Sequence, residues 1–425
     1  MYRTEPDHEN EKLPTGIPHI IGNEAAERFS FYGMKAILAV FLTQYMLDRN
    51  GNQDFLSEKE ATAWIHFFNT GVYLTPIVGA IIADRFFGKY KIIMWLSIVY
   101  CLGHFALAID ETRTGMMVGL TLIAIGAGGI KPCVSAHVGD QFGNKNSHYM
   151  TKIFGWFYLS INLGAFTSMI VTPWVLEKWG PAWAFGIPGG LMVLATIVFW
   201  IGRTRFVHIP PAGKEFTKKI FSAEGMKITG KLIVIYLFVA MFWALFDQTS
   251  SKWVFQARSM DMTVFGQTIL PSQMQSLNPI LVVTLIPVFT YWIYPTINKF
   301  FELTALRKIA IGFFLAIVAF AIPMWIEMRI EAGESPSVYW QALAYVFITA
   351  AEIMISITCL EFSYTQAPKS MKSFIMGLFM ASVALGNLFT ALVNKFGPAD
   401  LQGVAYYRFF TLCIGITAIL FLFGI

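Results

Sequence analysis

The sequence reads I-I-G-N-E-A-A-E-R-F-S-F-Y-G-M-K from Ile20 to Lys35 and continues with the apolar run Ala36–Phe41. This segment has the length of a membrane-spanning helix, yet it carries two glutamates and two basic residues. Each charge inside hydrocarbon costs at least about 2.5 kcal/mol. At about 100° per helical residue, one arc of about 140° holds Glu24, Glu27, Arg28, Tyr32 and Lys35. This charged stripe must face a protein interior or an aqueous cavity, with its opposite charges close enough to pair.

Two interpretations of the charged stripe remain open. A structural ion-pair cluster would only hold neighbouring helices together. A proton or substrate relay would use the same groups to bind and release charge, because ionisable side chains inside a membrane mark transport pathways. We favour the relay.

Composition assigns the chain to a broad class. Of its 425 residues, 56% are hydrophobic, 16% are aromatic and only 13% are charged, and the mean hydropathy is +0.58. A soluble globular domain carries about 25% charged residues. The chain is therefore a polytopic membrane protein, for which we expect the lipid bilayer as surroundings and no nucleic-acid partner. Its four cysteines have no paired spacing and suggest neither a disulfide framework nor a metal site.

Apolar stretches of about 20 residues predict an all-α membrane protein with twelve transmembrane helices. We place these helices at 17–47, 60–83, 91–110, 115–138, 150–174, 182–202, 230–257, 274–299, 308–328, 338–366, 373–395 and 405–425.

A polar connector at 203–229 follows the sixth span and divides the chain. We predict an N-terminal cytoplasmic tail over 1–16, one six-helix bundle over 17–202 and a second over 230–425. Lysines and arginines are concentrated in the loops on the side of the N-terminus, which predicts that both termini are cytoplasmic. The first residues lack the features of a cleavable signal peptide. Because Ile425 still lies in an apolar run, we expect a cytoplasmic tail to follow it.

The fourth predicted span carries Lys131 beside Pro132 and the small-residue run Gly126–Gly129. Small residues permit close helix packing, and a proline frees a backbone carbonyl. Lys131 could be a permanent counter-ion for Glu24 or Glu27. That role is compatible with transport, since a relay needs a partner that it can release.

Polar residues also interrupt later spans. Asn162 is a buried amide in the fifth span. Asp247 and Lys252 lie five residues apart in the seventh and do not share a helix face, so each is expected to pair with another helix. Glu352 lies in the middle of the tenth span, where a charge is costly, and Ser356 follows one turn later.

A histidine in the second span is a further candidate. His66 lies two helical turns before Tyr73, so the two side chains share a face. His66 is either a packed, hydrogen-bonded residue or a proton carrier, and the sequence leaves both interpretations open.

Several motifs in order resemble the proton-coupled oligopeptide transporter family of the major facilitator superfamily, along essentially the whole chain. The stretch Gly79–Lys91 resembles the loop signature of that superfamily. The motifs of the family itself are the E-x-x-E-R-F element at Glu24–Phe29 and the stretches Gly126–Pro132, Phe157–Phe166, Phe242–Gln248 and Glu361–Pro368. The last two stretches and His66 look especially like the animal di- and tripeptide carriers of the family.

The resemblance implies the major facilitator fold and a proton-coupled symporter that imports di- and tripeptides by alternating access. It implies no cofactor besides the coupling proton, no enzymatic activity, and a location in the plasma or inner membrane; we expect a monomer. The implied proton-coupling positions are Glu24, Glu27, Arg28, His66, Lys131 and Asp247.

The resemblance also implies a central cavity that binds a zwitterion. Its cationic patch for the peptide carboxylate would be Arg28, Lys35 and Lys131. The peptide amino terminus would be received by Asn162, Asn278 and Glu352, and the remaining lining residues would be Tyr32, Tyr73, Tyr158, Trp243 and Ser356. Such a pocket would recognise the charged amino and carboxyl termini of a peptide, and it would therefore accept varied side chains.

Two residues depart from the family pattern. Lys35 stands where an arginine is common, which loses bidentate carboxylate geometry. Thr290 stands where animal relatives carry an aspartate, so a gate ion pair from Lys231 is not expected here.

Three alternative functions compete with peptide import. A carrier of another small anion or an amino acid, such as nitrate or histidine, is the nearest, because plant relatives have diverged in that way; Glu352 would repel a simple anion. A peptide-sensing receptor would bind without transport, which the intact Glu24 and Glu27 disfavour. A membrane enzyme is disfavoured because the sequence offers no evident nucleophile–base pair, metal cluster or phosphate loop.

Overall fold

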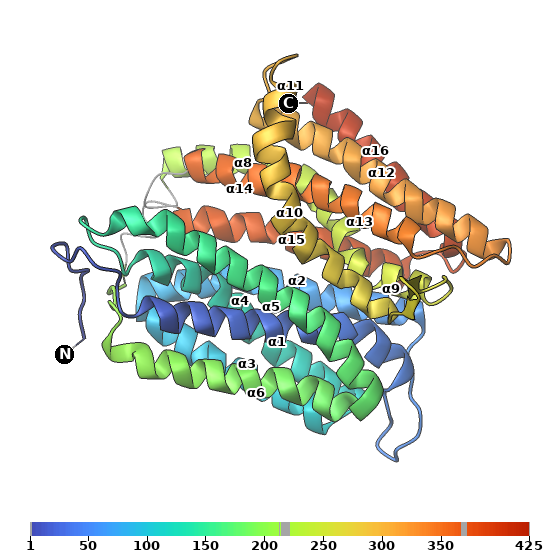
Figure 1. Cartoon of the computed structure of the whole chain (residues 1–425), viewed down its shortest axis with the longest axis horizontal. Helices are drawn as coiled ribbons and strands as arrows, with labels where there is room; N and C mark the ends of the chain where they lie inside the picture. The colour runs from blue at the N-terminus through green and yellow to red at the C-terminus, as the bar shows by residue number, and fades with distance from the viewer. Residues whose placement is uncertain (1, 212, 214–221, 367–371, 425) are drawn as a thin grey trace.

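The computed structural model describes residues 2–211, 213, 222–366 and 372–424. Residues 212 and 214–221 of the predicted connector, and residues 367–368 of the Glu361–Pro368 stretch, lie outside the described residues. The long helices run roughly side by side, with the N-terminus at one end of the molecule (Figure 1).

The first half of the chain forms long helices joined by short loops. Its elements are α1 (Ile17–Gln44), α2 (Glu58–Ile82), η1 (Ala83–Phe87), α3 (Lys89–Ile109), α4 (Arg113–Gly139), η2 (Ser147–Tyr149), α5 (Met150–Trp179), α6 (Pro181–Ile201) and η3 (Gly202–Thr204). Pro181 at the start of α6 has the φ angle that a helix requires, and the N–H that proline lacks would have no acceptor within the helix at this position.

The second half begins at α8 and is more often interrupted. Its elements are α8 (Ala223–Phe246), η4 (Asp247–Ser250), α9 (Lys252–Ala257), β1 (Thr263–Val264), β2 (Gln267–Thr268), η5 (Pro271–Ser276), α10 (Leu277–Val288), η6 (Phe289–Ile293), α11 (Tyr294–Ile297), α12 (Ala305–Glu331), α13 (Tyr339–Glu352), η7 (Ile353–Ile357), α14 (Thr358–Gln366), α15 (Lys372–Phe396) and α16 (Gly403–Gly424). The strands β1 and β2 pair antiparallel in a short hairpin between α9 and η5.

The helices match the predicted spans in number, with differences in detail. Within the described residues, eleven helices are long and apolar enough to cross a membrane. The remaining predicted span is α1, which is long enough but carries four charged side chains. Helix α8 begins at Ala223, inside the predicted connector. The predicted spans 230–257, 274–299 and 338–366 are broken by the irregular turns η4, η6 and η7, for which the apolar pattern gives no signal.

Local sequence explains where several helices begin. Helix α2 starts with a capping box, in which the Ser57 hydroxyl accepts from the Glu60 backbone N–H and the Glu60 carboxylate accepts from the Ser57 N–H. Gly88 and Gly180 have φ angles of 81° and 80°, which only glycine adopts readily. These two glycines allow the abrupt reversals between η1 and α3 and between α5 and α6.

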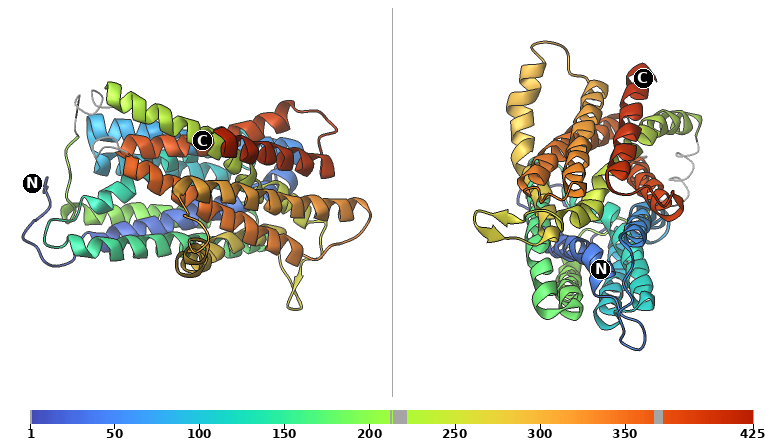
Figure 2. Two further views of the ribbon diagram at one scale, coloured as in Figure 1. Left: turned by 90° about the horizontal axis from the view of Figure 1, so that it is seen from above. Right: turned by 90° about the vertical axis from the view of Figure 1, so that its right-hand side faces the viewer.

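The two larger hydrophobic clusters of the described residues lie side by side, and a small third one gathers around Phe289 and Met354. One is drawn from Ile17 to Phe206 and also takes in Val254 and Phe255 of α9, whereas the other runs from Leu232 to Phe421. Seen from the right-hand side of Figure 1, the blue-to-green helices of the first half lie below the orange and red helices of the second (Figure 2, right).

The halves are joined by hydrogen bonds that gather on the side opposite the N-terminus. The Lys59 ammonium donates to the carbonyls of Gly397 and Pro398, at 2.9 and 3.0 Å. On the same side, the Gln275 amide donates to the carbonyl of Ala36 at 3.1 Å. In Figure 1, α12 and α16 are inclined to α1 and α6. The molecule is therefore closed by direct polar contacts on the side away from its N-terminus.

Glycines bring α2 against α4 within the first half. A Cβ atom added to Gly79 would lie 2.6 Å from the Cα of Gly129, closer than van der Waals contact allows. The small-residue run that precedes Lys131 therefore packs backbone against backbone, and this contact fixes the depth and rotation of α4.

We predict that Gly79→Ala lowers the melting temperature of the purified protein by several degrees, because overpacking at a fixed backbone contact costs about 1–3 kcal/mol. The measurement is thermal unfolding in detergent. Gly190→Ala is the matched control, since a Cβ atom added there meets nothing within 4 Å. Equal melting temperatures for the two variants would contradict this account.

Candidate functional site

The charged stripe of α1 begins with a buried ion triad. The Arg28 Nε atom lies 2.6 Å from Glu24 Oε1 and 3.1 Å from Glu27 Oε2. All three side chains are buried, and Gly164 lets α5 approach this turn so closely that an added Cβ would lie 2.7 Å from the Ala25 carbonyl. Two carboxylates thus share one guanidinium in a site shielded from lipid.

Lys131 lies near this triad, and its ammonium forms no ion pair with a carboxylate of the described residues. Its ammonium lies 3.8 Å from the ring centroid of Phe31 and 4.6 Å from that of Tyr73. Such cation–π contacts stabilise a cation by about 0.5–2 kcal/mol. Glu27 and Glu24 lie within electrostatic reach of this ammonium, so the role of Lys131 as their counter-ion stays a prediction.

Glu352 occupies the last turn of α13 and faces a partner from α10. The Asn278 amide donates to Glu352 Oε2 at 2.7 Å and to the Thr349 hydroxyl at 3.2 Å. The π-helical η7 follows at once and contains Ser356. Single π turns inside α-helices are frequent at functional sites, since they re-aim the side chains beside them.

Three tyrosines lie near Glu352, and two of them also lie near Arg28. Tyr32 lies within electrostatic reach of both Arg28 and Glu352. Tyr73 and Tyr158 also lie within electrostatic reach of Glu352 and of Tyr32. The structure therefore gathers these predicted residues from α1, α2, α5 and α13 into one region between the halves.

Asn162 and Trp243, two further predicted lining residues, are both buried. Asn162 is buried, and its amide donates to the carbonyl of Tyr158 on the preceding turn at 2.9 Å. Trp243 is 8% exposed and packs edge-on against Phe242 and Phe246, with its indole N–H buried and unpartnered. The Trp243 N–H is therefore available to an acceptor that enters the site.

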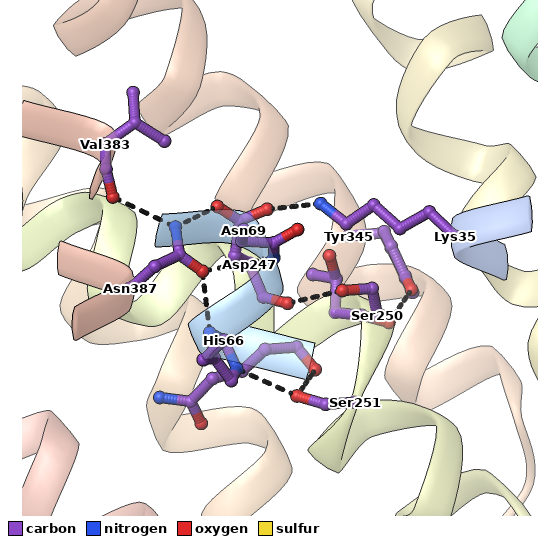
Figure 3. A network of polar contacts seen from close by, with 11 residues as sticks. Lys35, His66, Asn69, Asp247, Ser250, Ser251, Tyr345, Val383 and Asn387 are labelled. Atoms are coloured by element: carbon purple, nitrogen blue, oxygen red, sulfur yellow. Dashed lines mark hydrogen bonds and ion pairs between the residues drawn. The ribbon is translucent and has the colours of Figure 1, made fainter. Parts of the chain in front are cut away.

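A second buried network lies farther along α1 (Figure 3). The Lys35 ammonium donates to Asp247 Oδ1 at 2.6 Å, and Asn387 Nδ2 donates to Asp247 Oδ2 at 2.7 Å. His66 Nδ1 lies 2.7 Å from Asn387 Oδ1, and His66 Nε2 lies 3.1 Å from the Ser251 hydroxyl. The expectation that Asp247 pairs with another helix is confirmed, and its partner is α1. Lys35 is thus an interhelical ion-pair partner in this structure.

The network fixes the protonation pattern of His66. Because Asp247 is an acceptor, Asn387 must direct its amide nitrogen to it and its oxygen to His66. His66 Nδ1 therefore carries a proton, and Nε2 accepts from Ser251 when the ring is neutral. Protonation of Nε2 requires the Ser251 hydroxyl to turn away, toward the Gln248 carbonyl 3.5 Å from it.

Sequence reasoning missed Asn387, which joins the two halves at this point. Its oxygen accepts from both His66 of α2 and the Asn69 amide, the latter at 3.1 Å. The signal was an asparagine in the middle of the apolar span 373–395, where an amide needs partners. Its role depends on the register of α15 against α2, which one sequence does not reveal.

Metal binding is not indicated by the part of the chain that the structure describes, where no group of three or more His, Cys, Asp or Glu side chains could hold an ion.

Comparison with known proteins gives a consistent result. The profile described as the POT family matches residues 90–223 and 222–399. Mouse "Solute carrier family 15 member 2" is 37% identical over 395 residues, which cover 81% of this chain and 53% of that protein. "Peptide transporter family 1" of Drosophila melanogaster is 36% identical, over 75% of this chain and 48% of that protein. The chain spans about half the length of these curated relatives.

Solved structures resemble the chain over nearly its whole length. The structure of the POT family transporter PepTSo is 35% identical with a TM-score of 0.87, over 97% of this chain and 98% of that one. The structure of an auto-inhibited POT family peptide transporter is 34% identical, also with a TM-score of 0.87, over 96% of each chain. The predicted helical membrane fold is confirmed.

We predict that Asn387→Ala opens the side of the molecule away from the N-terminus. Leaving the Asp247 and His66 atoms without their partner costs about 1–3 kcal/mol. The measurement is maleimide labelling of Ser250→Cys, a buried position in the network, with the four native cysteines replaced. Labelling should become several-fold faster.

Asn394→Ala is the matched control for this experiment. The buried Asn394 amide donates to Thr390 and Tyr406, both within the second half. This control should lower stability without faster labelling. Equal acceleration in both variants would mean that Asn387 is only a structural residue of α15.

Proposed function

The chain belongs to the POT family, and from this premise we propose that it is a proton-coupled symporter that imports di- and tripeptides by alternating access. The names of its curated relatives, which include peptide transporters of insect and nematode, support this proposal. We further propose that it acts as a monomer in the plasma or inner membrane, with both termini in the cytoplasm.

The observation that carries the proposal is the placement of opposite charges on the two halves. Arg28 and Lys131 belong to the first half, whereas Glu352 belongs to the second. A short peptide is a zwitterion, so its carboxylate would bind the cations and its ammonium would bind Glu352. Tyr32, Tyr73, Tyr158 and Trp243 would form the walls, an arrangement typical of small-molecule sites.

Proton coupling follows from a count of charges. Glu24, Glu27, Arg28 and Lys131 together are neutral when all four are ionised. A peptide carboxylate adds one negative charge to this buried group, which is costly at low dielectric. Uptake of one proton by Glu24 or Glu27 restores neutrality and frees Arg28 from one of its partners. Substrate and proton would therefore enter together.

The Lys35–Asp247 network would act as a gate between the halves. We take residues 17–202 and 230–425 as the two bundles that rock, with 203–229 as the connector between them. With a cytoplasmic N-terminus, the side closed by these contacts would face outward. Protonation of Asp247 would weaken its contacts with Lys35 and Asn387 and let the outer side part.

The proposed function is tested with purified protein in liposomes loaded with a pH dye. An inward proton gradient and membrane potential are set, and Ala-Ala is added outside. We expect acidification that depends on the peptide and is lost with an analogue blocked at both termini. No acidification by folded protein would reject peptide symport, and nitrate and histidine would be the next substrates to test.

We predict that Glu27→Gln abolishes proton-driven uptake and leaves peptide counterflow measurable, because the amide cannot cycle a proton but preserves the shape of the site. Both rates are measured with labelled Ala-Ala in the same liposomes. Glu177→Gln, at an exposed position near the end of α5, is the control and should transport normally. Loss of both binding and counterflow would assign Glu27 a structural role.

We predict that Glu352→Gln weakens the binding of Ala-Ala at least about tenfold, since hydrogen bonds to a charged group contribute about 1.5–3 kcal/mol. Binding of N-acetyl-Ala-Ala, which lacks the ammonium, should change little. The measurement is competition against a labelled peptide. Equal weakening of both ligands would reject the role of Glu352 at the amino terminus.

A further inference from the structure

The surface formed by α2, α4 and α15 carries two adjoining hollows. One is an apolar groove of about 260 Å³ between α2 and α4, whose lining includes Trp64, Phe67, Leu120, Thr121 and Ile125. The second is a hollow of about 390 Å³ between α2 and α15, where the charged Lys59, Glu60 and Lys395 stand beside Trp64 and Phe67. Trp64 and Phe67 line both, so the two hollows adjoin at these side chains.

The two hollows are arranged by depth in the membrane. Lys59 and Glu60 belong to the first turn of α2, at the membrane surface away from the N-terminus, and Trp64 follows one turn deeper. Gly71 and Thr75 continue the apolar groove toward the membrane centre. A polar end at the surface with an apolar groove below it matches the shape of an amphiphile. The tryptophan lies at the interface, where this residue is enriched.

The second hollow carries side chains of both charges, the cations Lys59 and Lys395 and the anion Glu60. The Lys395 ammonium lies 5.4 Å from the ring centroid of Phe67, and no carboxylate of the described residues forms an ion pair with it. The Lys59 ammonium donates only to backbone carbonyls. Glu60 Oε2 accepts from the backbone and hydroxyl of Ser57, at 3.0 and 2.7 Å, and Glu60 lines the same hollow as the two lysines.

We propose that these hollows form a specific site for a phospholipid with an ethanolamine head group. The phosphate binds Lys395 and Lys59, the head-group ammonium binds Glu60, and one acyl chain fills the groove between α2 and α4. Water cannot fill this groove well, because its walls offer few polar partners. The head group contacts α2 of the first half and α15 of the second, so one lipid molecule bridges the halves where they meet.

The test is native mass spectrometry of the detergent-purified protein with added dioleoylphosphatidylethanolamine. Lys395→Gln should reduce the lipid-bound fraction several-fold, and Thr121→Trp should do the same by filling the groove from an exposed position. The matched controls are Lys178→Gln, an exposed lysine on the same side, and Leu194→Trp, an exposed position on α6; both should bind lipid normally.

Three results would overturn the site. Equal lipid binding by Lys395→Gln and Lys178→Gln would contradict the proposed contact between Lys395 and the phosphate. Normal lipid binding by Thr121→Trp would contradict the proposed seat of the acyl chain between α2 and α4. Dioleoylphosphatidylglycerol has the phosphate without the ammonium and should bind more weakly than the ethanolamine lipid, a preference that Glu60→Gln should abolish. Equal binding of the two lipids by the unaltered protein would reject the head-group assignment. None of these measurements depends on transport, so they stand apart from the proposed function.

Discussion

A charge inside a membrane must be met by protein, and this constraint places α1 between the two halves of the molecule. The Arg28 end of its stripe is satisfied within the first half, by two glutamates one turn or less away. The Lys35 end is satisfied by Asp247 of the second half. One helix therefore carries both the candidate proton site and the contact between the halves. A change of charge at Arg28 or at Lys35 alters the electrostatic interactions that position α1, and so affects the other end of the stripe.

The contacts within each half differ in kind from the contacts between them. Inside the first half, glycines such as Gly79 and Gly129 bring backbones together, an arrangement that cannot slide without a clash. Between the halves, much of the contact near Asp247 consists of hydrogen bonds that a proton can break. This contrast is consistent with two bundles that move as rigid bodies. Packed interiors are stiff, whereas a polar contact between the bundles is either formed or broken.

The sequence allowed the helices and the stripe to be predicted because apolar length and helical periodicity are local signals. It did not reveal the partner of Lys35, which lies 212 residues away on a helix whose register is set by tertiary packing. The bridging role of Asn387 and the aromatic surroundings of Lys131 were hidden for the same reason. The π turn after Glu352 also escaped prediction, because a one-residue insertion leaves an apolar span apolar.

The charge on α1 also affects how the protein is made. A helix with two carboxylates, a guanidinium and an ammonium is a poor substrate for insertion into lipid on its own, since each such residue opposes partition near the helix centre. The helices that shield its stripe, α5 above all, leave the ribosome only after α2, α3 and α4 have been synthesised. During that interval α1 must remain at the insertion machinery or pair its own charges. Biogenesis of this protein therefore requires that α1 be shielded from lipid until α5 has been synthesised.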